Sequence, residues 1–250
     1  MHYNFRDRGI VLRSYDYGEG HRIVVIFTKK SGKLRAVARG SRKTKSRFGS
    51  KLEPFSENEF LFYRKPEKEL FTVTGCSLIE SNKNLREDMS RYGYSAAMVE
   101  SVVLLTADED PDIKTYYLFK KYLKEVRDKE PAPSAWLFLF KLLKYSGYRL
   151  NMFDCIFCGK GAGPGMVFLP SDGGVCCRGC LSDKKYFLEV SGKALEEIRK
   201  LKPVRKIGPE IEREIGNIIA NFVKYQFGTE LNSVKFMEIF KKKNKLGKKR

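Results

Sequence analysis

Hydrophobic residues recur at the period of β-strands over the first third of the chain. From residue 8 to about 80, short runs rich in Val, Ile, Phe and Tyr are separated by turn residues such as YGEG and KSGK. Five short strands in about 75 residues predict a small closed barrel, for which the oligonucleotide-binding (OB) type is the natural expectation. The period alone does not distinguish it from an SH3-like barrel. The predicted strands cover residues 9–17, 21–29, 33–40, 57–65 and 69–80.

The apolar spacing changes to that of helices after residue 84. Asp110 followed by Pro111 is typical of an N-cap with proline at the first helical position, and residues 129–134 (KEPAPS) are expected to break the chain between two helices. Residues 133–147 are apolar almost all round, so this helix should form the buried centre of a bundle. The predicted helices cover residues 84–107, 111–128 and 133–147 and, after a cysteine-containing segment, 191–201, 208–228 and 231–243.

The charge balance indicates a polyanionic partner. The chain has 49 Lys and Arg against 30 Asp and Glu, a formal charge of +19 and a pI near 9.6, which favours nucleic acid over an acidic membrane surface. The N-terminus has no signal-peptide run, and no window approaches the roughly 18 apolar residues of a membrane span. We therefore expect a cytoplasmic protein with no membrane partner, whose thiols stay reduced.

Ten Lys or Arg residues and no Asp or Glu lie between Lys29 and Leu52. Residues 39–51 (RGSRKTKSRFGSK) have neither strand nor helix period and are expected to form a loop on the barrel, where cations can follow a backbone of phosphates. The lack of any balancing acid favours binding over a merely solvated face. The candidate nucleic-acid-binding residues are Lys33, Arg35, Arg39, Arg42, Lys43, Lys45, Arg47 and Lys51. Aromatic candidates for base stacking, most of them expected in the core, are Tyr15, Tyr17, Phe27, Phe48, Phe60, Phe62 and Tyr63.

Two C-x-x-C pairs have the spacing of a four-cysteine zinc site. Cys155 and Cys158 are followed, after 18 residues, by Cys177 and Cys180, and four thiolates close a tetrahedron about Zn²⁺ with no open position. One structural zinc ion is therefore the expected cofactor. Cys176 is the competitor, because using it in place of Cys177 would give a C-x-x-x-C second half. The matched two-residue gaps favour Cys177.

Together these patterns predict an α+β multidomain fold: an N-terminal OB-like barrel and a C-terminal helical bundle with an inserted four-cysteine zinc knuckle. The expected divisions are residues 1–81 for the nucleic-acid-binding barrel, 82–152 for the first part of the helical domain, 153–183 for the zinc-binding insertion, 184–240 for the second part of the helical domain, and 241–250 for a basic tail expected to be disordered.

The chain has no recognisable catalytic constellation. The acidic run DEDPD (108–112) falls at a helix junction, where a cap and first-turn charge are the expected roles. The Gly-rich spacer at 159–174 fits neither phosphate-loop pattern, and two histidines offer little general-base chemistry. We therefore expect neither enzymatic activity nor a small-molecule substrate, while a nuclease built from scattered carboxylates stays open as an alternative.

Residues 9–55 resemble the opening of the bacterial RecO family of DNA repair proteins in order, spacing and character. The resemblance includes the turn YGEG, the strand GKLRAVARG and the basic KSRF loop. The later CIFCG and GGVCCRGC resemble the zinc-binding form of the family, in which two glycines, two residues and then C-x-x-C recur. That phasing also favours Cys177 over Cys176. The helical regions agree only in order and length.

The resemblance implies a recombination mediator that acts at the nucleoid. Members of the family bind single- and double-stranded DNA, anneal complementary strands and associate with RecR. They help to load the RecA recombinase onto DNA covered by single-stranded DNA-binding protein, and some contact the acidic C-terminal tail of that protein. Charge and cysteines alone are equally compatible with an RNA-binding or ribosome-associated zinc-ribbon protein.

Overall fold

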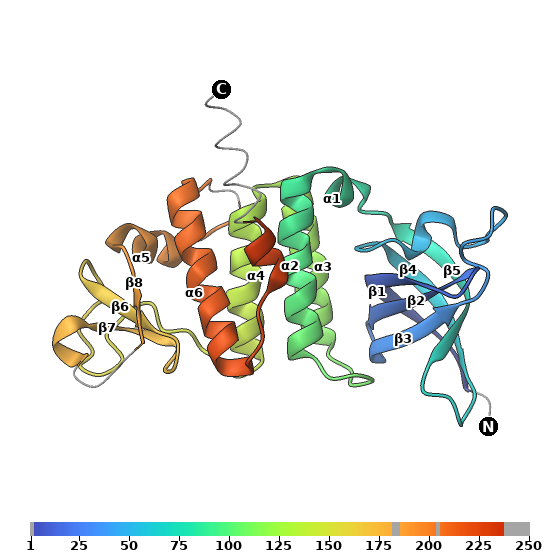
Figure 1. The fold of residues 1–250 in the computed structure, drawn as a ribbon, viewed down its shortest axis with the longest axis horizontal. Coiled ribbons are helices and arrows are strands. Elements are labelled where there is room, and N and C mark those ends of the chain that lie inside the picture. The colour runs from blue at the N-terminus through green and yellow to red at the C-terminus, as the bar shows by residue number, and fades with distance from the viewer. Residues whose placement is uncertain (1–2, 182–185, 204–205, 238–250) are drawn as a thin grey trace. The chain divides into compact units, whose positions relative to one another are not determined.

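The computed structural model describes residues 3–181, 186–203 and 206–237 (Figure 1). The basic tail expected at 241–250 lies outside the described residues. The chain divides into two compact units. The first consists of Met1–Tyr92 with Val102–Arg127, and the second of Gly93–Ser101 with Asp128–Arg250.

The first unit contains a closed five-stranded barrel, which lies at the blue end of the chain in Figure 1. Neighbouring strands follow the order β1-β2-β3-β5-β4, and β4 pairs with β1 to close the barrel. All pairs are antiparallel except β3 with β5. This confirms the predicted OB-like barrel. The strands are β1 (Tyr3–Tyr17), β2 (His21–Thr28), β3 (Gly32–Ala38), β4 (Glu57–Arg64) and β5 (Phe71–Glu80).

Alternation of side chains places one face of every strand in the barrel core. Val24, Ile26, Leu34 and Ala36 are buried from β2 and β3, and Phe60 belongs to the same cluster from β4. The 3₁₀ turn η1 (Gly49–Leu52) lies between β3 and β4 and adds to this core through its apolar residue, Leu52. The barrel interior is therefore filled with side chains, and any ligand must bind on its outer surface or loops.

Helices begin directly after the barrel. One helix was expected over 84–107, but the chain forms α1 (Lys83–Glu87) and α2 (Met89–Leu105), because Asp88 is extended and its carboxylate caps α2 by accepting from the N–H of Arg91. Helix α3 (Ile113–Asp128) follows. In its first turn, the N–H of Thr115 donates to the carboxylate of Asp112 at 2.9 Å. The N-cap is therefore Asp112, and the expected N-cap at Asp110 is wrong by two residues.

The second unit contains helices and a small hairpin. The expected break between the second and third helices is confirmed at residues 129–130, but α4 (Pro131–Tyr145) begins two residues before the predicted start at 133, because proline fits a first helical turn. Trp136 of α4 lies under Gly216 of α6 (Pro209–Phe227), where any larger side chain would be crowded. The other elements are β6 (Met166–Leu169), β7 (Gly174–Cys177), β8 (Leu188–Glu189), α5 (Gly192–Arg199) and a helical segment at 232–237. Within the described part of the chain, no helix is long and apolar enough to cross a membrane.

Candidate metal centre and nucleic-acid interface

Four cysteines of the second unit bring their sulfur atoms together. Cys155 and Cys158 flank a tight turn in which the N–H of Gly159 donates to the carbonyl oxygen of Cys155 at 2.9 Å. Cys177 ends β7, and Cys180 ends the single 3₁₀ turn η2 (Arg178–Cys180) that follows it. The four Sγ atoms all lie within 4.8 Å of one another, so this group could hold a metal ion.

The sulfur–sulfur distances fit tetrahedral coordination. Zinc–thiolate bonds of about 2.3 Å require tetrahedron edges of about 3.8 Å. The Sγ atom of Cys177 lies 3.8 Å from that of Cys155, 3.7 Å from that of Cys158 and 3.4 Å from that of Cys180. Four sulfur ligands at this spacing would surround an ion and leave no position for a reactive water, which fits a structural role.

Cys176 lies outside this group. Successive residues of a strand point to opposite faces, so Cys176 and Cys177 of β7 cannot both reach the cluster. Cys176 is fully buried and pairs across the hairpin with Val167 of β6. Burial raises the pKa of its thiol. The structure thus brings together the four cysteines that the C-x-x-C spacing favours and directs the fifth into the core of the hairpin.

The thiols of the cluster do not ionise alike. Burial raises the pKa of Cys155, but backbone N–H donors from Cys158, Cys177 and Phe157 outweigh it and hold that pKa at about 6. Hydrogen bonds shared with Cys177 and Cys158 raise the pKa of Cys180 to about 12. Negative charges less than 4 Å apart repel one another, so ionisation of all four thiols requires a cation among them.

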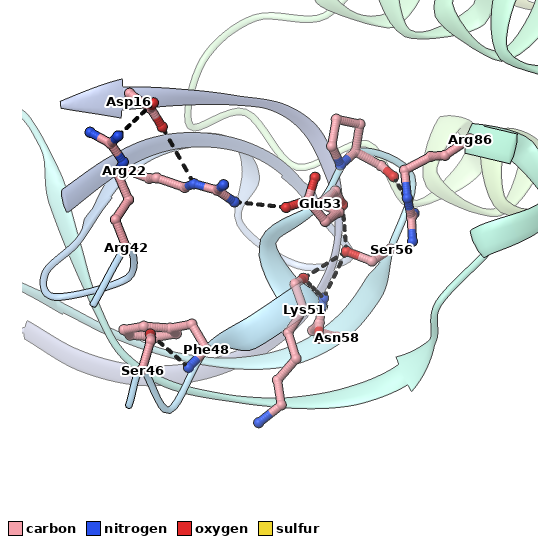
Figure 2. Close-up of polar contacts among 11 residues, drawn as sticks. Asp16, Arg22, Arg42, Ser46, Phe48, Lys51, Glu53, Ser56, Asn58 and Arg86 are labelled. Atoms are coloured by element: carbon pink, nitrogen blue, oxygen red, sulfur yellow. Dashed lines mark hydrogen bonds and ion pairs between the residues drawn. The ribbon is translucent and has the colours of Figure 1, made fainter. Parts of the chain in front are cut away.

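In the first unit, both ends of the basic loop at 39–51 are fixed to the barrel. At its start, the N–H of Gly40 donates to Nδ1 of His21 at 2.9 Å. At its end, the hydroxyl of Ser56 and the amide of Asn58 both donate to the carbonyl oxygen of Lys51, at 2.6 and 2.7 Å (Figure 2). The middle of the loop is anchored by Phe48, whose ring is buried in the barrel core. The backbone that carries the exposed cations is therefore fixed to the barrel at three points.

The candidate cations of this loop fall into two groups. Arg39, Lys43 and Lys45 are exposed and make no hydrogen bond or ion pair through their side chains with any other described residue. Arg42, by contrast, pairs with Asp16 at 3.4 Å, and Figure 2 shows that carboxylate between Arg42 and Arg22. The unpaired group is the one that a phosphate backbone would meet without competition from a protein carboxylate.

The remaining candidates differ in availability. Arg35 is exposed on the outer face of β3. Arg47 is exposed, and its guanidinium lies 5.1 Å from the ring centre of Phe48. Lys51 turns its ammonium back to the carbonyl oxygen of Arg47 at 3.0 Å. Arg47 and Lys51 could contact nucleic acid beside the unpaired cations of the loop. Arg35 could do so from β3, which leads into the loop.

The expectation for Lys33 needs correction. Only 7% of this residue is exposed, and its ammonium donates to the carbonyl oxygens of Val103 and Thr106 at 2.8 and 2.7 Å and pairs with Asp108 at 3.2 Å. A lysine with all three donors engaged inside the protein has none left for phosphate. We therefore remove Lys33 from the candidate interface.

An open groove of about 680 Å³ adjoins the start of the basic loop. It is lined by Tyr17, His21, Val37, Arg39 and Tyr63, and by the β4–β5 turn. Tyr17 is half exposed, whereas Phe27, Phe48, Phe60 and Phe62 are core residues, as expected of most aromatic candidates. The groove therefore combines aromatic rings with a free arginine, the pair of features that binds single-stranded nucleic acid in other barrels.

Sequence reasoning missed Lys65 and Lys68, which line the same groove from the β4–β5 turn. Their turn, KPEKE, mixes both signs of charge and lies outside the acid-free stretch between Lys29 and Leu52. The proline between two predicted strands indicated a hairpin turn. A turn on the predicted nucleic-acid-binding barrel was the signal that could have identified these two lysines.

Comparisons with known proteins agree with this architecture. Residues 1–82 match the family model described as "Recombination protein O N terminal", and residues 86–235 match "Recombination protein O C terminal". The barrel and the four-cysteine helical region are thus those of a DNA repair and recombination protein. The chain belongs to the RecO family.

Individual relatives extend over most of the chain. A protein of Alkaliphilus metalliredigens called DNA repair protein RecO is 29% identical, covering 95% of this chain and 98% of its own. The protein of the same name from Bacillus pumilus is 30% identical over 96% of both chains, and that of Rubrobacter xylanophilus 37% over 72% of both.

Proposed function

We propose that this protein is a recombination mediator that binds single- and double-stranded DNA, anneals complementary strands and helps to load RecA onto DNA coated with single-stranded DNA-binding protein. The observation that carries the proposal is the row of exposed cations without acidic partners, Arg39, Lys43 and Lys45, beside the aromatic groove of the barrel. Membership of the RecO family supports it.

Annealing follows from charge neutralisation. Two complementary strands repel each other through their phosphates until cations replace the counterions between them. A chain with a formal charge of +19 supplies such cations. No covalent step is needed, and we propose that the protein acts without catalysis.

We propose that the metal is a single Zn²⁺ held by Cys155, Cys158, Cys177 and Cys180. Four thiolates at tetrahedral spacing select zinc over the harder divalent cations. The ion would fix the two C-x-x-C turns relative to each other and thereby stiffen the hairpin of β6 and β7, where the apolar core alone is small.

We further propose that RecR and single-stranded DNA-binding protein, through its acidic tail, are the protein partners, with RecA contacted indirectly. On this account the protein works at the nucleoid. The proposed domain limits are 1–81 for the barrel, 82–152 and 184–240 for the helical domain, and 153–183 for the zinc insertion.

The test is competition and annealing with bare strands. Fluorescent single-stranded DNA is bound and then competed with unlabelled DNA or RNA of equal length, and annealing of complementary DNA is followed in parallel. The proposal predicts DNA binding at least as strong as RNA binding, faster annealing and intact strands with Mg²⁺ or Mn²⁺ present. Preference for RNA without annealing would establish an RNA-binding protein instead, and cleavage products would establish a nuclease.

A further inference from the structure

One face of α3 carries a line of exposed basic and aromatic side chains. Lys114, Tyr117, Lys121 and Lys124 are all exposed, and their spacing of three and four residues places them along one side of the helix. The line is roughly 15 Å long at 1.5 Å per residue. It belongs to the same compact unit as the barrel.

The acids that β4 and β5 place beside this face are already paired. Glu57 of β4 is buried and accepts from the ammonium of Lys120 at 2.7 Å and from the hydroxyl of Tyr116 at 3.0 Å. Glu80 of β5 pairs with Arg127 at 3.0 Å. The ammonium groups of Lys114, Lys121 and Lys124 have no acidic partner among the described residues, so the face keeps a net positive charge.

The barrel extends this face. Lys29, which follows β2, holds its ammonium 5.1 Å from the ring centre of Tyr117. An open groove of about 420 Å³ runs beside the helix, and its lining includes the apolar Ile79 and Leu123 together with Lys121 and Lys124. The face therefore offers cations next to apolar surface, as the groove at the basic loop does.

The two basic surfaces lie at opposite ends of β2. The basic loop is held to His21 at the first residue of that strand, and Lys29 follows Thr28 at its last. Eight residues of extended chain separate the two by roughly 23 Å. One short stretch of nucleic acid would have to cross the barrel to touch both.

An acidic segment stands in the way of such a crossing. The α2–α3 connection lies against the start of β3, where the N–H of Glu109 donates to the carbonyl oxygen of Lys33 at 3.0 Å. The backbone of Asp110 fills the space beside Gly32, where an added Cβ would lie 2.3 Å from the carbonyl oxygen of Asp110. Asp110 itself is exposed. The carboxylate of Glu109 is paired with Arg64, but a phosphate backbone that ran from Arg35 to α3 would pass the exposed carboxylate of Asp110 and be repelled.

We propose that the face formed by Lys114, Tyr117, Lys121, Lys124 and Lys29 is a second nucleic-acid site, which takes the phosphate backbone of a second single strand while the basic loop holds the first. The cations stand in a line and do not converge on a point, which suits successive phosphates better than one carboxylate of an acidic peptide. Two strands held on one protein meet at a high effective concentration. The inference rests on the proposed strand-binding function and deepens it.

The test counts strands. Full-length protein is mixed with oligothymidine of about ten nucleotides, within the range of one barrel site, and the bound species are weighed by native mass spectrometry. Wild type is expected to carry two oligonucleotides per chain, and the variant Lys121→Glu/Lys124→Glu one. Lys144→Glu/Lys202→Glu is the matched control, because it makes the same change in net charge at exposed lysines of the other unit and should still carry two.

Affinity separates the outcomes. The Lys121→Glu/Lys124→Glu variant should keep its affinity for the first strand within about twofold and bind the second about tenfold more weakly. A second strand that binds the variant as well as it binds wild type would overturn the inference. A variant that keeps both strands but no longer binds an acidic peptide would overturn it too. Failure of wild type to bind even one strand would refute the proposed function itself.

Discussion

The ammonium of Lys33 donates a hydrogen bond of 2.7 Å to the carbonyl oxygen of Thr106, just beyond the end of α2. A residue whose surroundings in the sequence suggested a DNA contact is therefore an anchor between the barrel and the helix that follows it. We expect Lys33→Met to lower the free energy of unfolding by about 1–3 kcal/mol, because two backbone carbonyls lose their buried donor.

Urea denaturation checks the stability of the Lys33 variant, and titration of DNA binding against salt checks its affinity. Binding per folded molecule should be unchanged. A variant of wild-type stability that binds DNA more weakly would mean that Lys33 contacts the strand after all.

The second prediction concerns the unpaired cations of the basic loop. Lys43→Ala/Lys45→Ala should lower the slope of log affinity against log salt by about 1.4, since each phosphate contact to a single strand contributes about 0.7. The fold should be unaffected, because both side chains are exposed and make no hydrogen bond or ion pair that the variant would break. Fluorescence anisotropy at several salt concentrations measures the slope.

Arg42 supplies the matched control for that loop. Its guanidinium pairs with Asp16, which also pairs with Arg22, so the charge of Arg42 is already engaged within the protein and the Arg42→Ala change should alter the slope by less than either lysine would. Equal effects of Arg42 and of the two lysines would show that the ion pair opens on binding. An unchanged slope in Lys43→Ala/Lys45→Ala would move the site elsewhere.

The third prediction separates the adjacent cysteines. Cys177→Ser should release the metal, because its Sγ lies within 4 Å of each of the other three sulfurs. Cys176→Ser, on the opposite face of β7, should retain one metal ion per chain. Metal content by mass spectrometry decides it, and the assignment is reversed if the ion leaves with Cys176.

The fourth prediction is a pH dependence of stability. Burial raises the pKa of Glu212, in the first turn of α6, to about 7. A carboxyl whose pKa is higher in the folded chain than in the unfolded chain contributes stability at acidic pH that is lost as the pH rises through about 7. The melting temperature of Glu212→Gln should therefore equal that of wild type at pH 5 and exceed it at pH 8.

Glu210→Gln serves as the control for that comparison. It removes a carboxylate from the same first turn, but Glu210 is exposed, so the variant controls for the change in net charge. Thermal melts of all three proteins at each pH make the measurement. A Glu212→Gln variant that gains nothing at pH 8 would show that this carboxyl stays hydrated in the folded protein.

The barrel was predictable because its strands carry their own signal. The period-two pattern of residues 21–29 and 57–65 gave β2 and β4 to within a residue. The break at Asp88 was not predictable in the same way, because the helical period continues through it and only the capping geometry reveals it. Proline at 131 was taken as a breaker, although the same residue fits a first helical turn.

The candidate sites divide along a similar line. The cysteine pairs are local in sequence, so their spacing indicated the cluster that the fold assembles. The fate of each cation depends on partners far away in the chain: Lys33 meets Thr106 and Arg42 meets Asp16 only after folding. Charge counting therefore located the basic loop but not which of its members are free.

Annealing of complementary strands that have first been coated with single-stranded DNA-binding protein tests the central claim most directly. Bare strands anneal through charge neutralisation alone, whereas coated strands require a mediator that also engages the coat. The account predicts that wild type accelerates annealing of coated strands and that Lys43→Ala/Lys45→Ala does so markedly less. Coated strands that anneal no faster with wild type than without protein would contradict it.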